Sequence, residues 1–374
     1  MSPFSNRSLS IKYKKNYMKI GILTQPLTTN YGGILQNYAL QTILKRMGHE
    51  VWTLDYFSYN WIDWAISNSK IIVLKLLGRP VKWAVTPTAK IKLETPLRKF
   101  VKENVSLTTP RTKWFERKIV QDYHLDGLVV GSDQVWRPIY NTRIVDLFLD
   151  FVKDFNIKRI AYAASFGTDS WEFTDIETNQ CKILAQKFNA ISVREVTGVS
   201  LCEKYLGVKA KHVLDPTLLL TADDYLGLCK NIPVKSPFVF AYVLDQNPQK
   251  ISEIKRFAQE KELPCFIMSA GPNVSDDDRV EKWLSYFRDA AYVITDSFHG
   301  TVFSIILQKD FYVFGNKKRG NSRFDSLLNI LGLSNRIIEV EISELPKIDW
   351  KLVHTSLNDE RINSTQWLEH SLNK

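Results

Sequence analysis

The chain has 374 residues, of which 44% are hydrophobic and 24% charged, as expected for a soluble globular protein with room for two domains. No apolar run approaches the roughly 18 uncharged residues of a membrane-spanning helix, and the N-terminus lacks a signal-peptide core, so we expect a cytoplasmic protein. The net charge of +10 suggests anionic partners, such as phosphates or an anionic membrane surface, whereas the sequence contains no nucleic-acid-binding motif.

Two sets of apolar runs, each alternating with helical patterns, follow a polar and basic segment, residues 1–17, which we expect to be a disordered tail. The first set of expected strands comprises 19–25, 51–56, 127–133, 159–167, 190–195 and 211–215. A proline-containing stretch separates it from the second set, which comprises 238–245, 264–270, 292–297 and 310–315. Near-continuous apolar strands separated by helices indicate parallel sheets covered on both faces.

The sequence therefore predicts an α/β protein with two Rossmann-like domains, whose parallel sheets face one another across a cleft. We place the N-terminal domain at 18–218 and the C-terminal domain, which ends in a helical segment, at 219–374. This arrangement resembles the GT-B fold, in which ligands bind where the C-terminal ends of strands meet the cleft. A likeness of fold leaves the chemistry open.

An insertion at 61–93 interrupts the first domain. It contains three tryptophans and six basic residues, with Asp63 as its single acid. Tryptophan beside basic and aliphatic residues is typical of a helix that lies on a membrane surface. The alternative is a helical flap whose apolar face packs on the domain.

The stretch "TTNYGGILQNYALQ" (28–41) joins an expected strand to a helix through two glycines. Such a turn presents backbone N–H groups at a helix N-terminus. No phosphate-binding loop motif is present. We predict that this segment contacts sugar hydroxyls through Asn30, Tyr31, Gly32, Gly33 and Gln36, with an ordinary tight turn as the alternative.

The stretch "VVGSDQVWRP" (129–138) places Ser132, Asp133, Gln134 and Trp136 at the end of an expected strand. Asp133 is expected to orient or deprotonate a sugar hydroxyl, or alternatively to cap a following helix. Trp136 is expected to stack on a pyranose ring. These four residues complete the predicted acceptor side.

Two further stretches carry candidate anion-binding residues. Arg194 in "ISVRE" follows a strand, and its fork suits a phosphate or carboxylate, with a salt bridge to Glu195 as the alternative. In "DSFHGTVFSIILQ" (296–308), His299 lies at a strand end and a helix start, where the helix dipole favours anions. The alternative for His299 is a neutral ring bonded to the backbone.

Two charged segments are weaker candidates. The basic stretch 315–328, with Arg323, could meet a phosphate or form a solvated loop. The acidic run 275–279 precedes an expected helix and is better explained as its N-terminal cap than as a metal site. The four cysteines lie far apart without a ligand histidine nearby, so we expect no metal site.

Taken in order, six stretches resemble the polysaccharide pyruvyl transferase family. They are "NYGGILQNYALQ", "GSDQVW", "ISVRE", "HVLDPTLLL", "DSFHGTVFSIILQ" and "NSRFDSLL". The resemblance implies a GT-B-like fold and phosphoenolpyruvate as donor. It also implies that the pyruvyl group forms a ketal across two hydroxyls of a sugar, in a cell-surface polysaccharide or its lipid-linked precursor, with release of phosphate.

By the same resemblance, His299 and Arg194 are expected to bind and activate phosphoenolpyruvate. We expect Ser297, Gly300, Thr301 and Arg323 to complete the donor site. His299 would protonate the methylene carbon, and Asp133 would act as base toward the acceptor, without any metal or cofactor.

A lipid-linked acceptor would place the enzyme at the inner face of the membrane. Two other functions remain open from the sequence. One is a GT-B glycosyltransferase that uses a nucleotide-sugar donor. The other is a non-catalytic saccharide-binding protein.

Overall fold

A computed structural model of the chain describes residues 17–56, 69, 87–234, 237–269, 279–315 and 321–374. Residues 1–16 of the expected tail, most of the insertion at 61–93, the acidic run up to residue 278 and the basic residues 317–319 lie outside this part. The predictions of a disordered tail and of membrane contact by the insertion therefore stay predictions. Among the described residues, no helix is long and apolar enough to cross a membrane.

The N-terminal half contains a six-stranded sheet with the order β2-β1-β3-β4-β5-β6. Its strands are β1 (Lys19–Leu23), β2 (Glu50–Thr53), β3 (Gly127–Val130), β4 (Lys158–Ala164), β5 (Ala190–Val193) and β6 (Lys211–His212). All neighbours run parallel. Leu23 pairs with Val130, so β1 and β3 end at the same edge of the sheet.

The C-terminal half contains a five-stranded parallel sheet with the order β11-β10-β9-β7-β8. Its strands are β7 (Val239–Tyr242), β8 (Cys265–Met268), β9 (Tyr292–Thr295), β10 (Asp310–Phe314) and β11 (Ile337–Ile338). The central strand β7 is buried along its whole length, as its unbroken apolar sequence requires. Two parallel α/β sheets confirm the predicted fold class.

Helices connect the strands and cover both sheets. In the first half they are α1 (Tyr31–Arg46), α3 (Pro87–Asn104), α4 (Arg117–Asp122), α5 (Asp175–Ala185) and α6 (Val196–Leu201). Short 3-10 helices are η1 (Pro138–Tyr140), η2 (Ile144–Phe148), η3 (Asp150–Val152) and η5 (Pro216–Leu219), and the π-helical segment η4 (Cys202–Leu206) continues α6. In the second half they are α7 (Ala222–Cys229), α8 (Pro248–Glu260), α9 (Val280–Asp289), α10 (Phe298–Ile306), α11 (Ser322–Ile330), the turn η6 (Ser334–Arg336) and α12 (Trp350–Asn373).

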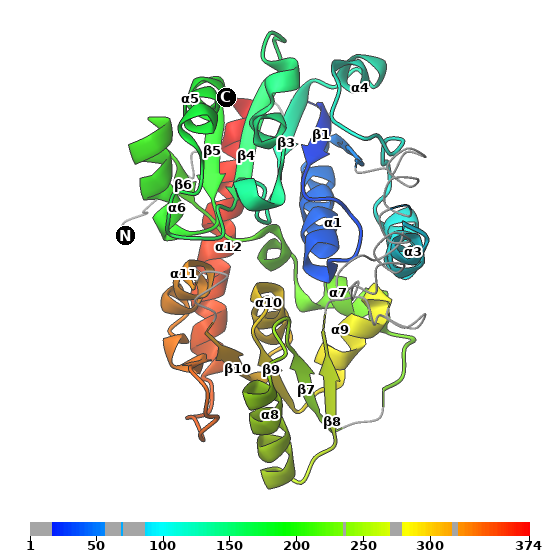
Figure 1. The fold of residues 1–374 in the computed structure, drawn as a ribbon, viewed down its shortest axis with the longest axis vertical. Coiled ribbons are helices and arrows are strands. Elements are labelled where there is room, and N and C mark those ends of the chain that lie inside the picture. The colour runs from blue at the N-terminus through cyan, green and yellow to red at the C-terminus, as the bar shows by residue number, and fades with distance from the viewer. Residues whose placement is uncertain (1–16, 57–68, 70–86, 235–236, 270–278, 316–320) are drawn as a thin grey trace, which may run out of the picture.

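Helix α12 ties the two halves together, because it runs alongside both in Figure 1. Near its C-terminal end, Trp367 packs against Tyr162 of β4 with ring centroids 6.2 Å apart. Ser364 Oγ accepts a hydrogen bond of 3.0 Å from the backbone N–H of Leu214. The last helix of the chain therefore packs on the N-terminal sheet and holds the segment that follows β6.

The two halves also meet directly, at the starts of α1 and α10 (Figure 1). Tyr31 of α1 stacks on Trp283 of α9 with ring centroids 5.4 Å apart and the planes 7° from parallel. Tyr242, at the end of β7, meets Tyr31 edge to face. One hydrophobic cluster includes residues of both sheets, such as Ile22 and Phe240. This packing brings the strand ends of the two sheets toward one place.

Candidate active site

His299 lies at the start of α10, immediately after β9. Ser297 caps the helix by accepting a hydrogen bond from the N–H of Gly300. The helix start sits close to the strand, because a β-carbon on Gly300 would lie 2.3 Å from Thr295 Oγ1. The Ser297 cap and this close packing direct His299 away from the C-terminal sheet and toward α1.

The imidazole of His299 packs on the backbone of Gly32, in the first turn of α1. A β-carbon at residue 32 would lie 2.0 Å from His299 Nδ1, which no side chain could occupy without displacing the ring. The side chain of Asn30 fixes this turn, since its Oδ1 accepts a hydrogen bond of 3.1 Å from the N–H of Gly33. Gly32, which was predicted to contact a sugar, therefore provides the backbone surface on which His299 packs.

Arg194 follows β5 and reaches the same place from the N-terminal sheet. Its Nη1 donates to Asp215 Oδ2 at 2.8 Å, and its Nη2 lies 3.9 Å from Asp133 Oδ1. The guanidinium carbon lies 4.4 Å from the ring centroid of Phe298. Among the described residues, Nε and Nη2 have no hydrogen-bond partner although both are buried. These two atoms form the edge with which a guanidinium binds a carboxylate or phosphate through two bonds.

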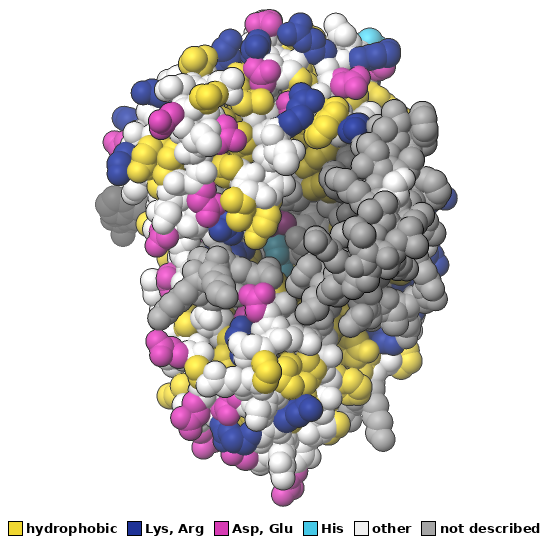
Figure 2. Space-filling view, viewed as in Figure 1, with side chains coloured by type: hydrophobic (Ala, Val, Ile, Leu, Met, Phe, Trp, Pro, Cys, Tyr) yellow, Lys and Arg dark blue, Asp and Glu magenta, His cyan; other side chains and the backbone are white. Residues whose placement is uncertain are grey.

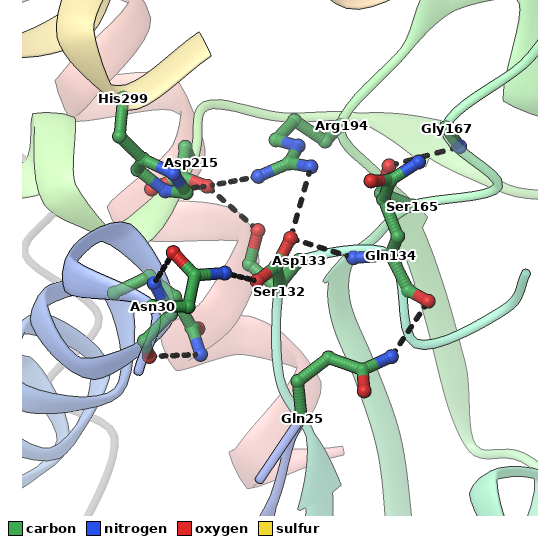
Figure 3. Close-up of polar contacts among 12 residues, drawn as sticks. Gln25, Asn30, Ser132, Asp133, Gln134, Ser165, Gly167, Arg194, Asp215 and His299 are labelled. Atoms are coloured by element: carbon green, nitrogen blue, oxygen red, sulfur yellow. Dashed lines mark hydrogen bonds and ion pairs between the residues drawn. The ribbon is translucent and has the colours of Figure 1, made fainter. Parts of the chain in front are cut away.

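Asp215 joins Arg194 to His299 (Figure 3). Its Oδ2 accepts from Ser132 Oγ at 2.7 Å and from Arg194, and it lies 3.7 Å from His299 Nε2. Thr217 donates to Oδ1 through its N–H at 3.0 Å. Burial alone would raise the pKa of Asp215, but His299 and Arg194 lower it to well below its usual range. Asp215 is therefore an ionised carboxylate in the interior.

Arg323, in α11, brings a second guanidinium to the site. It is buried, and its guanidinium carbon lies 5.9 Å from the ring centroid of Phe298, the ring that Arg194 also contacts. Burial, and then the charge of Arg194, lower the pKa of Arg323 to about 10. Arg323 and Arg194 therefore lie near the same aromatic ring, and a role of Arg323 in donor binding stays a prediction. Two neighbouring buried cations favour an anion between or beside them.

Asp133 lies after β3, beside Arg194, in the left-handed backbone region with φ 75°. Such a conformation is strained for a residue other than glycine and is frequent at functional sites. Its Oδ2 accepts from Asn30 Nδ2 at 3.0 Å, and its Oδ1 accepts from the N–H of Gln134 at 2.9 Å. The residues that follow Asp133 form a turn and no helix until Pro138, so the helix-capping alternative is wrong.

Four predicted acceptor residues pack inside the protein. Ser132 is fully buried, and its Oγ donates to Asp215 Oδ2. Trp136 is fully buried, stacks on Phe148 and donates from Nε1 to the carbonyl of Leu147, so its ring is unavailable to a sugar. Gln36 is also fully buried. Its Nε2 donates to Thr24 Oγ1 and to the carbonyl of Gly33. Tyr31 belongs to the aromatic contact between the domains. The expectation that their side chains contact the acceptor is corrected by this burial.

The remaining predicted residues lie around the site and make hydrogen bonds or packing contacts with neighbouring segments. Thr301 Oγ1 donates to the carbonyl of Ser297 at 3.2 Å within α10. The side chain of Gln134 packs against Gly167, where a β-carbon would lie 1.7 Å from its Nε2. A β-carbon at Gly33 would lie 3.2 Å from Asp133 Oδ2, so a larger residue there would require the Asp133 side chain to shift slightly.

A pocket of about 590 Å³ opens beside Asp133 on the N-terminal half. Asn30, Asp133 and Gln134 line it, as do the residues Tyr56, Trp114, Tyr140, Arg143 and Asp146, which sequence reasoning missed. Arg143 forms an ion pair with Asp146: its Nε lies 2.9 Å from Oδ2, and its Nη2 donates a hydrogen bond of 3.0 Å to Oδ1. Burial raises the pKa of Asp146, and Arg143 opposes that rise.

Figure 2 shows acidic, basic and histidine side chains together in a hollow near the middle of one face, between the two halves. Two parallel α/β sheets with charged groups at their facing strand ends define a protein of the two-domain GT-B-like class. Within it, the chain belongs to the polysaccharide pyruvyl transferase family, whose sequence model matches residues 30–318. This confirms the resemblance seen in the sequence. No protein of curated function matches the sequence significantly.

Several solved structures share the general arrangement of the chain. The S. aureus MnaA–UDP co-structure is 10% identical, with 96% of this chain and 91% of that chain covered and a TM-score of 0.47. The UDP-GlcNAc 2-epimerase from Methanocaldococcus jannaschii is 11% identical, with 91% and 92% covered and a TM-score of 0.46. The Neisseria meningitidis UDP-GlcNAc 2-epimerase bound to UDP-GlcNAc is 10% identical, with 91% and 99% covered and a TM-score of 0.43. Similarity this low carries no information about substrate.

Proposed function

We propose that the protein transfers the pyruvyl group of phosphoenolpyruvate to two hydroxyls of a sugar in a cell-surface polysaccharide or its lipid-linked precursor. The observation that carries this proposal is the buried Arg194, whose Nε and Nη2 form a two-atom binding edge without a hydrogen-bond partner among the described residues. His299 and Arg323 lie beside it. This is a place for a small, highly charged anion next to a group able to give a proton.

The donor fits these groups chemically. Phosphoenolpyruvate carries a carboxylate and a phosphate, each of which a guanidinium can bind through two hydrogen bonds. Arg194 would hold one of them and Arg323 the other. The helix start at Ser297, Gly300 and Thr301 adds a positive field at the same place.

The reaction follows from the proton that His299 supplies. Transfer of this proton to the methylene carbon turns it into a methyl group and leaves an electron-poor carbon next to it. One sugar hydroxyl attacks that carbon, the bond to the phosphate oxygen breaks, and a second hydroxyl closes the ketal. Of the two hydroxyl protons released, one replaces the proton lost by His299 and the other leaves with phosphate.

Asp133 is the proposed base toward the acceptor. Its carboxylate accepts two hydrogen bonds, from Asn30 and from the N–H of Gln134, and retains further lone pairs. It lies between Arg194 and the pocket on the N-terminal half. A sugar hydroxyl bonded to Asp133 would therefore be close to a donor bound by Arg194.

The cellular setting belongs to the same proposal. A lipid-linked acceptor would bring the enzyme to the cytoplasmic face of a membrane, where anionic lipids attract a protein of net charge +10. Co-sedimentation with vesicles that contain an anionic lipid tests this setting, and binding that is independent of the anionic lipid would argue against it.

The function is tested by phosphate release from phosphoenolpyruvate in the presence of candidate saccharides. The wild type should release phosphate only when an acceptor is present, and His299→Gln should abolish release while its circular dichroism stays native. Arg194→Lys keeps the charge but loses the fork, so it should raise the KM for phosphoenolpyruvate at least about tenfold. Release of a nucleoside diphosphate from a nucleotide sugar, without consumption of phosphoenolpyruvate, would overturn the proposal.

A further inference from the structure

We infer that the pocket bounded by Asp133, Tyr56, Trp114, Tyr140, Arg143 and Asp146 binds the acceptor, and that it selects an uncharged pyranose over an acidic one. The role as acceptor site rests on the proposed function, whereas the preference for an uncharged sugar rests on the pocket itself. Tyr56 follows β2, and four of the other residues lie in the connection between β3 and β4, which begins at the edge of the sheet where ligands bind in α/β proteins.

The size and the walls of the pocket suit a sugar. Its volume of about 590 Å³ lies within the range of small-molecule sites. Trp114 and Tyr140 provide aromatic surface, against which the C–H groups of a pyranose can pack. Tyr140 is 49% exposed, so a ligand can cover it. The guanidinium of Arg143 lies 4.9 Å from the ring centroid of Trp114 and helps to fix the ring.

The charges on the walls favour an uncharged ligand. Of the described residues around the pocket, Asp133, Arg143 and Asp146 carry charge. Arg143 binds Asp146 with two nitrogens. The cation beside Asp133 is Arg194 at 3.9 Å, which is not among the residues that line the pocket, so Asp133 presents a negative charge to the pocket. An acidic sugar would meet the like charge of Asp133 and would have to compete with Asp146 for Arg143. The donor anion, in contrast, would be attracted by the positive charges of Arg194 and Arg323.

The same charged groups can bind hydroxyls. Oδ1 of Asp146 accepts a hydrogen bond from Arg143 Nη2, and Oδ2 lies 2.9 Å from Arg143 Nε, so both oxygens keep lone pairs for another donor. A carboxylate held in a fixed orientation can accept hydrogen bonds from two adjacent hydroxyls of a pyranose. Uncharged polar residues, among them Thr28, Thr29 and Thr142, complete the wall.

The pocket is continuous with the donor groups through Asp133. This residue lines the pocket, and its Oδ1 lies 3.9 Å from Arg194 Nη2. A sugar in the pocket would therefore present a hydroxyl to Asp133 on the side that faces Arg194. The acceptor and the donor would share one wall.

Ligand binding without phosphoenolpyruvate tests the inference by itself. The probes are the methyl glycosides of galactose, mannose, glucose and N-acetylglucosamine, with methyl glucuronide as the acidic counterpart of the glucoside. Saturation-transfer NMR on the full-length protein measures their affinities. We expect at least one neutral glycoside to bind, and methyl glucuronide to bind at least tenfold more weakly than that glycoside.

A matched pair of variants locates the binding. Tyr140 lines the pocket, whereas its neighbour Ile139, which is 61% exposed, does not. Tyr140→Ala should weaken binding of the neutral glycoside at least fivefold, and Ile139→Ala should leave it unchanged. The inference is overturned if no neutral glycoside binds, if methyl glucuronide binds as well or better, or if the two variants behave alike. Failure to release phosphate from phosphoenolpyruvate would instead count against the proposed function.

Discussion

At the scale of single residues, the contact between His299 and Gly32 decides where the proposed acid lies. The ring packs on a backbone position that has no room for a β-carbon. The glycines at 32 and 33 were expected from the sequence to form a turn that contacts sugar. The structure shows that residue 32 must be small because the His299 ring packs against it. The sequence does not reveal this contact, because the two residues are 267 positions apart.

Gly32→Ala should therefore displace His299 and reduce phosphoenolpyruvate turnover at least about tenfold, with a stability loss of about 1–3 kcal/mol from overpacking. Gly227→Ala is the matched control, since Gly227 also lies in a helix and a β-carbon there meets nothing within 4 Å. The control should keep full turnover and gain about 0.5–1 kcal/mol. Phosphate release and urea denaturation measure both effects. Full turnover in Gly32→Ala would contradict the placement of His299.

Asp215 is the residue-scale feature that the sequence concealed. Asp215 caps the short helical turn η5, because its side chain accepts a hydrogen bond from the N–H of Thr217. Its contacts with Arg194 and Ser132 span 21 and 83 residues of chain, which no local pattern reveals. The family stretch contained the residue, but only the fold shows what it touches.

Asp215→Asn should cost about 3–5 kcal/mol at neutral pH, because it leaves the buried charge of Arg194 without its partner. The pKa of Asp215 is lowered in the folded state, so the carboxylate stabilises the fold above its unfolded value of 3.8. That stabilisation is lost as the pH falls below this value toward the folded pKa. Urea denaturation from pH 7 down to pH about 3 measures the free energy of unfolding of the wild type and of Asp215→Asn. The difference between these two free energies should become smaller once the pH falls below the unfolded pKa of Asp215. A gap of constant size would contradict an ionised, paired Asp215.

At the scale of elements, α12 supports the loop that carries Asp215. Ser364 accepts from the N–H of Leu214, and Arg361 donates to the carbonyls of Leu218 and Leu220. A helical segment at the C-terminus was expected from the sequence. The packing of this helix on the N-terminal sheet was not expected, because its local sequence pattern does not indicate which element it contacts.

Ser364→Ala should leave the N–H of Leu214 unpaired and cost about 1–3 kcal/mol. Asn363→Ala, at an exposed neighbouring position of the same helix, should change stability by no more than about 0.5 kcal/mol. Thermal or chemical denaturation of both variants measures the difference. Equal stabilities would mean that α12 does not hold this loop.

At the scale of the whole molecule, the fold was predictable because its strands are apolar runs bounded by turns. All ten expected strands coincide with observed ones, although the structure shortens several, such as 211–215 to Lys211–His212. The strand Ile337–Ile338 was missed, since two residues give no periodicity. Parallel sheets could be inferred because strands such as β7 are buried on both faces.

The candidate site was predictable in part. Residues at strand ends, such as Arg194, Asp133 and His299, could be found because parallel strands end at one edge of a sheet. The sequence does not show toward which side of its element a polar or aromatic side chain points. Trp136 and Gln36 were therefore assigned to the acceptor site although both are buried. The pocket residues Trp114, Tyr140 and Arg143 were missed because irregular loops bring them together.

The central claim is that this site protonates phosphoenolpyruvate and transfers its pyruvyl group to a sugar. It is tested most directly by the reaction in D₂O with phosphoenolpyruvate labelled at its carbons, followed by mass spectrometry and NMR of the saccharide product. We expect a ketal that contains the three labelled carbons and one solvent deuterium on its methyl group, with one phosphate released per ketal. A product without donor carbon, or a ketal whose methyl group carries no solvent deuterium, would contradict it.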